Sequence, residues 1–101
     1  VNIDDELYSY IVRLVAATRK HKKLLLGASP RASVALMHLS QAYAFIKGRN
    51  YVLPDDIAGL FRFAIGHRLI LSQEAKLERI TVDEVLTEIL RTTDVPYKGK
   101  R

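Results

Sequence analysis

The segment between Ser29 and Gly48 constrains the fold most, because it is long, nearly all apolar and marked at both ends. On a helix its apolar side chains point to almost every side, which is typical of a helix in the middle of a domain. A serine followed by a proline is a common helix start, and a glycine commonly ends one. We therefore predict an enclosed helix over 30–47, with Ser29 as its N-cap and Pro30 as its first residue.

Three other segments each carry one apolar stripe at helical spacing, which predicts helices over about 4–20, 54–66 and 82–91. Thr81 and Glu84 fit a capping box in front of the last of these. Leu53 is a poor cap for the third helix. Residues 69–71 fit either the end of the third helix or a short extended piece. The fold class is thus all-α, a compact arrangement of four helices, with a possible short extended piece near 69–80.

Composition excludes several classes of protein but does not identify the function. The 101 residues suggest one domain, and the absence of cysteine excludes disulfides and thiolate metal sites. No apolar run approaches the roughly 20 residues that span a bilayer, and residues 1–4 do not resemble a signal peptide. We expect a cytoplasmic protein, a folded domain over 1–97 and a disordered tail over 98–101. The net charge of +5 permits contact with a polyanion.

Charge placement carries most of the functional inference. Acidic residues lie at the starts of three predicted helices and basic residues near helix ends, as the helix dipole favours. The helix over 30–47 breaks this pattern, because its first turn holds Arg31 and no acid. A cation at a positive helix end suggests that a bound anion compensates it, and phosphate matches the guanidinium fork best. Alternatively, Arg31 points into water or pairs with an acid elsewhere.

The segment before Arg31 has two further features. Residues 24–26 are three leucines, which we expect to pack into the core and fix the loop. Gly27 and Ala28 are small enough to let a ligand or another backbone approach closely. A rigid, crowded segment would then bring Arg31 to a defined place.

Other candidate sites are weaker. The basic run 19–23 could bind nucleic acid, but a solvated helix end is the favoured explanation. His21, His38 and His67 show no metal-ligand spacing, so no metal site is expected. The serines show no partnered histidine and aspartate, and we find no catalytic constellation in the chain.

Residues 27–33, with the sequence GASPRAS, resemble the sensor-2 motif of MoxR-type AAA+ ATPases. The resemblance extends over nearly all of residues 3–97. It includes 10–12 and 18–19, which resemble the first helix of that family's lid, and 48–57, which resemble the turn into its third helix. Residues 67–69 and 95–96 also fit. Leu53 departs from the pattern, since the family usually has a threonine or a similar cap there.

The resemblance implies that the chain is the C-terminal helical lid of such an ATPase, without its αβα core. No phosphate-binding loop of the form GxxxxGK[S/T] occurs here. The lid would close over the nucleotide and supply Arg31 to stabilise the γ-phosphate, with Ser29 and Pro30 shaping the helix start. Tyr10 and Ile11 would pack near the adenine, or simply belong to the core.

The resemblance also implies ligands and partners for the full-length protein. ATP with Mg²⁺ would bind there, whereas the isolated chain would hold no cofactor and would not be an enzyme by itself. The expected partners are the missing core, further copies in a homo-oligomeric ring and an unknown client protein. A membrane is not expected. The alternative function is a standalone basic helical module that binds nucleic acid.

Overall fold

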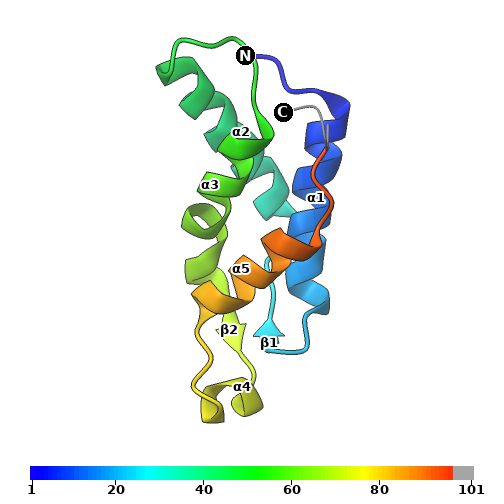
Figure 1. Ribbon diagram of the computed structural model, residues 1–101, viewed down its shortest axis with the longest axis vertical. Coiled ribbons are helices and arrows are strands. Elements are labelled where there is room, and N and C mark those ends of the chain that lie inside the picture. The colour runs from blue at the N-terminus through cyan, green and yellow to red at the C-terminus, as the bar shows by residue number, and fades with distance from the viewer. Residues whose placement is uncertain (97–101) are drawn as a thin grey trace.

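The computed structural model describes residues 1–96 and confirms the all-α fold class, with one small sheet added (Figure 1). The main helices are α1 (Asp5–Lys20), α2 (Arg31–Ile46), α3 (Pro54–Ile65) and α5 (Val82–Thr92). Strands β1 (Leu24–Leu26) and β2 (Ile70–Leu71) pair antiparallel. A 3-10 turn, η1 (Gly66–Arg68), and a short helix, α4 (Gln73–Leu77), complete the described elements.

The molecule is elongated, with extents of 44 × 26 × 20 Å. Helices α2 and α3 pack side by side and run in opposite directions, α1 packs on α2, and α5 crosses both α1 and α3 (Figure 1). The strands and α4 lie at the end of the molecule opposite the α2–α3 loop. The core lies between the four main helices, and its largest fully buried side chains include Leu7, Tyr10, Ile11, Leu14, Leu36, Ile57, Phe61, Ile65 and Leu86.

Helix α2 is not enclosed, which corrects the sequence-based expectation. Ala32, Leu36 and Ala44 are buried, but Phe45 and Ile46 near its C-terminal end are exposed. The described neighbours of α2 are chiefly α1 and α3, which cover only part of its circumference. The apolar pattern shows which residues could be buried, whereas the number of neighbouring helices decides which of them are.

The helix ends follow local chemistry with one correction. The Thr81 capping box is confirmed: the Glu84 amide donates to the Thr81 hydroxyl at 3.1 Å, and the Thr81 amide donates to the Glu84 carboxylate at 2.8 Å. At α2, Pro30 occupies the N-cap position and no side chain caps the helix. The predicted Ser29 side-chain cap is therefore absent, although the Ser29 carbonyl accepts from the Ala32 amide at 2.9 Å.

The uncertain segment after α3 resolves into η1, β2 and α4. The extended interpretation of residues 69–71 is confirmed by β2, which pairs with β1. Helix α4 was not predicted, because its five residues are too few to show a periodic stripe. It begins at Ser72, whose hydroxyl accepts from the Ala75 amide at 3.1 Å.

Only the first of the three leucines in β1 is buried. Leu24 packs in the core, whereas Leu25 is 74% exposed and Leu26 is 52% exposed. The expectation that all three fix the loop by burial is wrong for two of them, because a strand at the end of the molecule has neighbours on one side only. The predicted tail over 98–101 lies outside the described residues.

Candidate functional site

The segment that leads into α2 lies against the C-terminal turn of α1. A Cβ atom on Gly27 would stand 2.5 Å from the carbonyl oxygen of Thr18 and 2.7 Å from the Cα atom of Arg19. These are backbone atoms of a helix and cannot give way cheaply, so glycine is required for this approach. The expectation that a small residue admits another backbone is confirmed, and that backbone belongs to α1.

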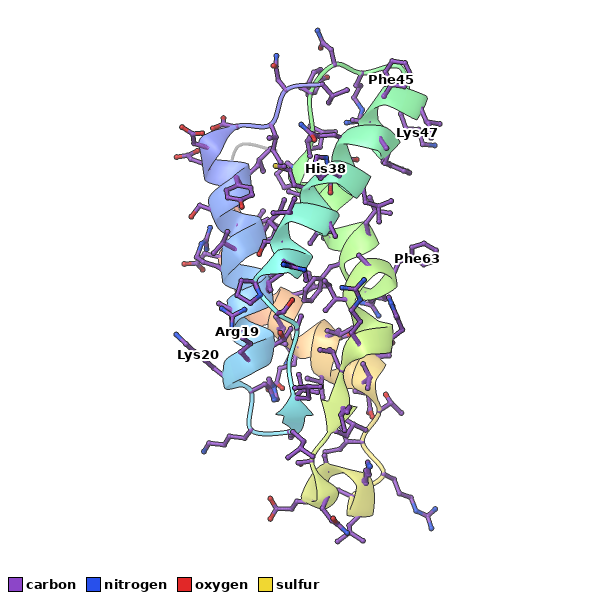
Figure 2. All side chains as sticks on the ribbon, turned by 180° about the vertical axis from the view of Figure 1, so that it is seen from behind. Arg19, Lys20, His38, Phe45, Lys47 and Phe63 are labelled. Atoms are coloured by element: carbon purple, nitrogen blue, oxygen red, sulfur yellow. The ribbon has the colours of Figure 1, made fainter. Side chains whose placement is uncertain are left out.

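Two consecutive side chains of α1 hold the next peptide in place. The buried Thr18 hydroxyl donates to the Val15 carbonyl at 2.6 Å and accepts from the Ala28 amide at 2.9 Å. The Arg19 guanidinium donates to the Ala28 carbonyl at 3.2 Å. Figure 2 shows Arg19 near the end of α1. We call these contacts of Thr18, Arg19, Gly27 and Ala28 the loop clamp, and they fix the backbone immediately before α2.

Arg31 follows the loop clamp as the first residue of α2. Its side chain is exposed, and within residues 1–96 it makes no hydrogen bond or ion pair. Ser29 and Pro30 beside it are exposed as well. The structure therefore presents one cation to solvent at the start of a helix that has neither an acid in its first turn nor a side-chain cap.

The other helices of the described chain have acidic residues where α2 has Arg31. Helices α1, α3, α4 and α5 all carry an acid in the first turn. A helix start bears a partial positive charge from its unpaired amides, and each acid there stabilises its helix. The first turn of α2 adds a positive charge to a positive end, and this combination favours an anion from outside the chain.

Tyr10 and Ile11 belong to the core of α1. They are 1% and 0% exposed, and the Arg13 guanidinium lies 5.7 Å from the centre of the Tyr10 ring. Burial raises the pKa of the Tyr10 hydroxyl above its ordinary value, although the Arg13 charge acts in the opposite direction. Core packing thus accounts for both side chains, and a contact with adenine stays a prediction.

The basic run 19–23 is partly used inside the fold. Arg19 belongs to the loop clamp, and the Nε2 atom of His21 lies 2.8 Å from the Glu88 carboxylate on α5. The Nδ1 atom of His21 accepts from the Lys23 amide at 3.1 Å, which places the proton of the neutral ring on Nε2. The hydrogen bond from His21 lowers the pKa of Glu88. These contacts give two of the five residues a structural role.

The sequence did not reveal the loop clamp or the His21–Glu88 contact. Thr18 lies among the buried residues of α1, where a hydroxyl that needs a partner is the available signal in the sequence. The contact between His21 and Glu88 joins residues 67 positions apart, so the sequence pattern around either residue cannot predict it.

Residues 1–96 contain neither a cluster of metal ligands nor a membrane-spanning helix. Within residues 1–96, no group of three or more histidine, aspartate or glutamate side chains is arranged to hold a metal ion. His38 and His67 are exposed. No helix in the described part of the chain is long and apolar enough to cross a membrane.

Comparisons with known proteins identify the family of this chain. A model of the AAA lid domain family matches residues 16–89, which include the loop clamp and Arg31. The uncharacterized protein YeaC of Bacillus subtilis is 46% identical to this chain over 97% of the chain and 31% of its own length. Chaperone MoxR1 of Mycobacterium tuberculosis is 34% identical over 89% of the chain and 26% of its own length.

A solved structure shows the same fold. The crystal structure of a candidate ATPase from Cytophaga hutchinsonii superposes with a TM-score of 0.88 and 36% sequence identity, covering 94% of this chain and 32% of that one. The chain therefore spans about a third or less of the length of these relatives. Because the family model matches well over half of the chain, and the relatives include MoxR proteins, the chain belongs to the AAA lid domain family and is a lid of the MoxR-type AAA+ ATPases.

Proposed function

We propose that this chain is the nucleotide-sensing lid of its parent ATPase and that Arg31 is the sensor-2 arginine. The relatives are about three times as long, so an ATPase core would lie in the part of the protein beyond these 101 residues. That core would hold the phosphate-binding loop and the Mg²⁺ ligands. ATP would bind there, and the lid would close over it.

The observation that carries the proposal is the uncompensated start of α2. Arg31 is exposed and unpaired within residues 1–96, and its helix has no acid and no side-chain cap in the first turn. The loop clamp holds the preceding backbone by two hydrogen bonds to Ala28. A charged residue that has a fixed backbone and no internal partner is available to an external anion, and only its side chain has to be ordered on binding.

The chemistry of the site suits the terminal phosphate of ATP. The Arg31 guanidinium would stabilise the charge that develops on the γ-phosphate oxygens during hydrolysis. The start of α2, with Ser29 and Pro30, would add the positive end of the helix dipole. Loss of the γ-phosphate would remove this attraction, so the angle of the lid would follow the nucleotide state.

The likeness to MoxR1, which is named a chaperone, supports a role of the full-length protein in acting on other proteins. We propose that it assembles into a homo-oligomeric ring and uses hydrolysis to remodel a client protein or to promote cofactor insertion. The client is unknown, and the lid by itself performs no chemical step.

The test replaces Arg31 in the full-length protein. Arg31→Ala should lower the ATP turnover number by roughly 100-fold, a typical loss when one stabiliser of developing charge is removed. The control is Arg91→Ala, which removes an exposed arginine from the far end of α5 and should leave turnover unchanged. Wild-type turnover in Arg31→Ala would show that Arg31 has no part in hydrolysis.

A nucleic-acid-binding module remains the rival function. It predicts binding of DNA or RNA by the chain that weakens steeply as salt is added. Arg19 and His21 argue against this function, because both side chains already have partners within the fold. Gel retardation at low salt separates the two functions: a shifted band that salt abolishes would favour the rival.

A further inference from the structure

The two side chains of the loop clamp differ in their exposure to water. Thr18 is 0% exposed and Ala28 is 1% exposed, so water cannot replace the hydrogen bond between them. Arg19 lies at the surface near the end of α1 (Figure 2), so water can replace its contact with the Ala28 carbonyl. A buried amide that loses its acceptor costs far more than an exposed carbonyl that gains a water. Thr18 is therefore the stronger of the two holding groups.

The Thr18 hydroxyl uses both of its hydrogen-bonding capacities. It donates to the Val15 carbonyl at 2.6 Å, and this bond turns its lone pairs toward the Ala28 amide, from which it accepts at 2.9 Å. Serine keeps both capacities, whereas valine has nearly the same shape as threonine and neither capacity. The hydrogen-bonding role of position 18 can therefore be separated from its role in packing.

The position of Ala28 is passed on to the first turn of α2 by the backbone. The Ala32 amide donates to the Ser29 carbonyl at 2.9 Å. The Ser33 amide donates to the Pro30 carbonyl at 3.1 Å. These bonds join the two residues directly after Ala28 to the helix, so a shift of Ala28 moves the first turn of α2 with it. A misplacement of about 1 Å in a group that acts in catalysis can cost up to about 100-fold in rate.

We propose that Thr18 is a positioning residue for ATP hydrolysis, which acts through the Ala28 amide on the placement of Arg31. This inference rests on the proposed function, because Arg31 is the group that would contact the γ-phosphate. Thr18 itself touches neither the nucleotide nor the reacting atoms. Arg19 has the same positioning role with a smaller effect, since its contact with Ala28 is exposed.

The test replaces Thr18 in the full-length protein. Thr18→Val should lower the ATP turnover number about tenfold, because the buried Ala28 amide must move to find another acceptor. Thr18→Ser keeps the hydroxyl and should stay within about twofold of the wild type. The matched control is Thr92→Val, since the hydrogen bonds of the Thr92 hydroxyl stay within α5, and turnover should not change.

A double-mutant cycle with Arg31→Ala distinguishes positioning from a general structural role. Thr18→Val should cause no further loss of turnover in the Arg31→Ala protein, because both changes act through one guanidinium group. A second loss of about tenfold there would show that Thr18 acts elsewhere and would overturn the inference. Wild-type turnover in Thr18→Val would also overturn it, as would equal losses in Thr18→Ser and Thr18→Val.

Circular dichroism at the assay temperature shows whether each variant is folded. If Thr18→Val is unfolded, the exposed Arg19→Ala variant takes its place in the cycle. It should lower turnover about threefold in the wild-type background and not at all in the Arg31→Ala background. Equal losses from Arg19→Ala in both backgrounds would overturn the inference.

The same measurements separate this inference from the proposed function. A loss of about 100-fold in Arg31→Ala, together with wild-type turnover in a folded Thr18→Val protein, would support the sensor role of Arg31 and refute the positioning role of Thr18. Wild-type turnover in Arg31→Ala would instead refute the proposed function.

Discussion

Helices α2 and α3 both begin near a proline, yet their first turns have opposite character. At α3, the Asp56 carboxylate accepts a hydrogen bond from the Leu53 amide at 2.8 Å. It also accepts hydrogen bonds from the Nη1 and Nη2 atoms of Arg49, at 2.8 and 2.9 Å. At α2, the first turn contains Arg31 and no acid, and no side chain caps it. One helix start is neutralised from within the chain, and we propose that the other is neutralised by an anion from outside.

The two helix starts are stabilised by different means. Leu53 cannot cap α3 through its side chain, and Asp56 compensates by reaching back to the Leu53 amide. Helix α2 could be capped in the same way by an acid three residues into the helix, but it has none. Its position depends instead on the loop clamp, which fixes the backbone without using the helix start itself.

The largest effect is expected at Gly27. Gly27→Ala would place a Cβ atom within 2.7 Å of three backbone atoms of α1, so α2 must shift away and the free energy of unfolding should fall by about 3 kcal/mol. Gly59→Ala is the matched control, because nothing lies within 4 Å of its new Cβ and alanine favours the interior of α3. Urea unfolding of both variants measures the difference, and equal stabilities would refute the close approach.

A smaller loss of stability is expected at the start of α3. Asp56→Ala removes the Leu53 amide's acceptor and the partner of Arg49, so unfolding should become easier by about 2 kcal/mol. The control is Asp83→Ala, whose ion pair with Arg62 is exposed and should contribute about 0.5 kcal/mol or less. If the two variants lose the same stability in urea, the α3 start is not specially stabilised.

The same carboxylate should show in the pH dependence of stability. Burial acts to raise the pKa of Asp56, but the Arg49 and Leu53 hydrogen bonds outweigh it and hold the pKa below the ordinary value of 3.8. A lowered pKa in the folded state stabilises the fold above pH 3.8, and this contribution is lost as pH falls through the folded pKa. Asp56→Asn should therefore flatten the acid end of the stability profile, and an unchanged profile would contradict this assignment.

The smallest effect on stability is expected when the charge at the start of α2 is reversed. Arg31→Glu gives α2 the acidic first turn of its neighbours and should raise the free energy of unfolding by roughly 0.3–1 kcal/mol. The same variant of the full-length protein should lose ATP turnover, because an acid would repel the phosphate. A variant that is less stable than the wild type would contradict the view that the positive charge of Arg31 disfavours the start of α2.

Much of the fold could be predicted because its signals are local. The capping box of Thr81 and Glu84 involves residues three apart, and the four main helices show their stripes within single segments. Arg31 could be singled out for the same reason, since a missing acid in one turn is visible in the sequence. The resemblance of residues 27–33 to the sensor-2 motif then supplied a ligand for it.

The remaining features depend on contacts between distant segments. Leu24 is buried and Leu25 is exposed, although both are leucines. The difference comes from the position of β1 in the folded molecule. The exposed end of α2 at Phe45 follows from how few helices surround it. The loop clamp needs α1 and the Gly27 segment to meet at backbone distance, which neither segment reveals alone.

The most direct test of the central claim is a crystal structure of the full-length protein with Mg²⁺ and a non-hydrolysable ATP analogue. The account predicts that the Arg31 guanidinium lies within hydrogen-bond distance of a γ-phosphate oxygen, with the start of α2 directed at the phosphates. An Arg31 side chain that points into solvent or pairs with a carboxylate, while the nucleotide is bound elsewhere, would contradict it.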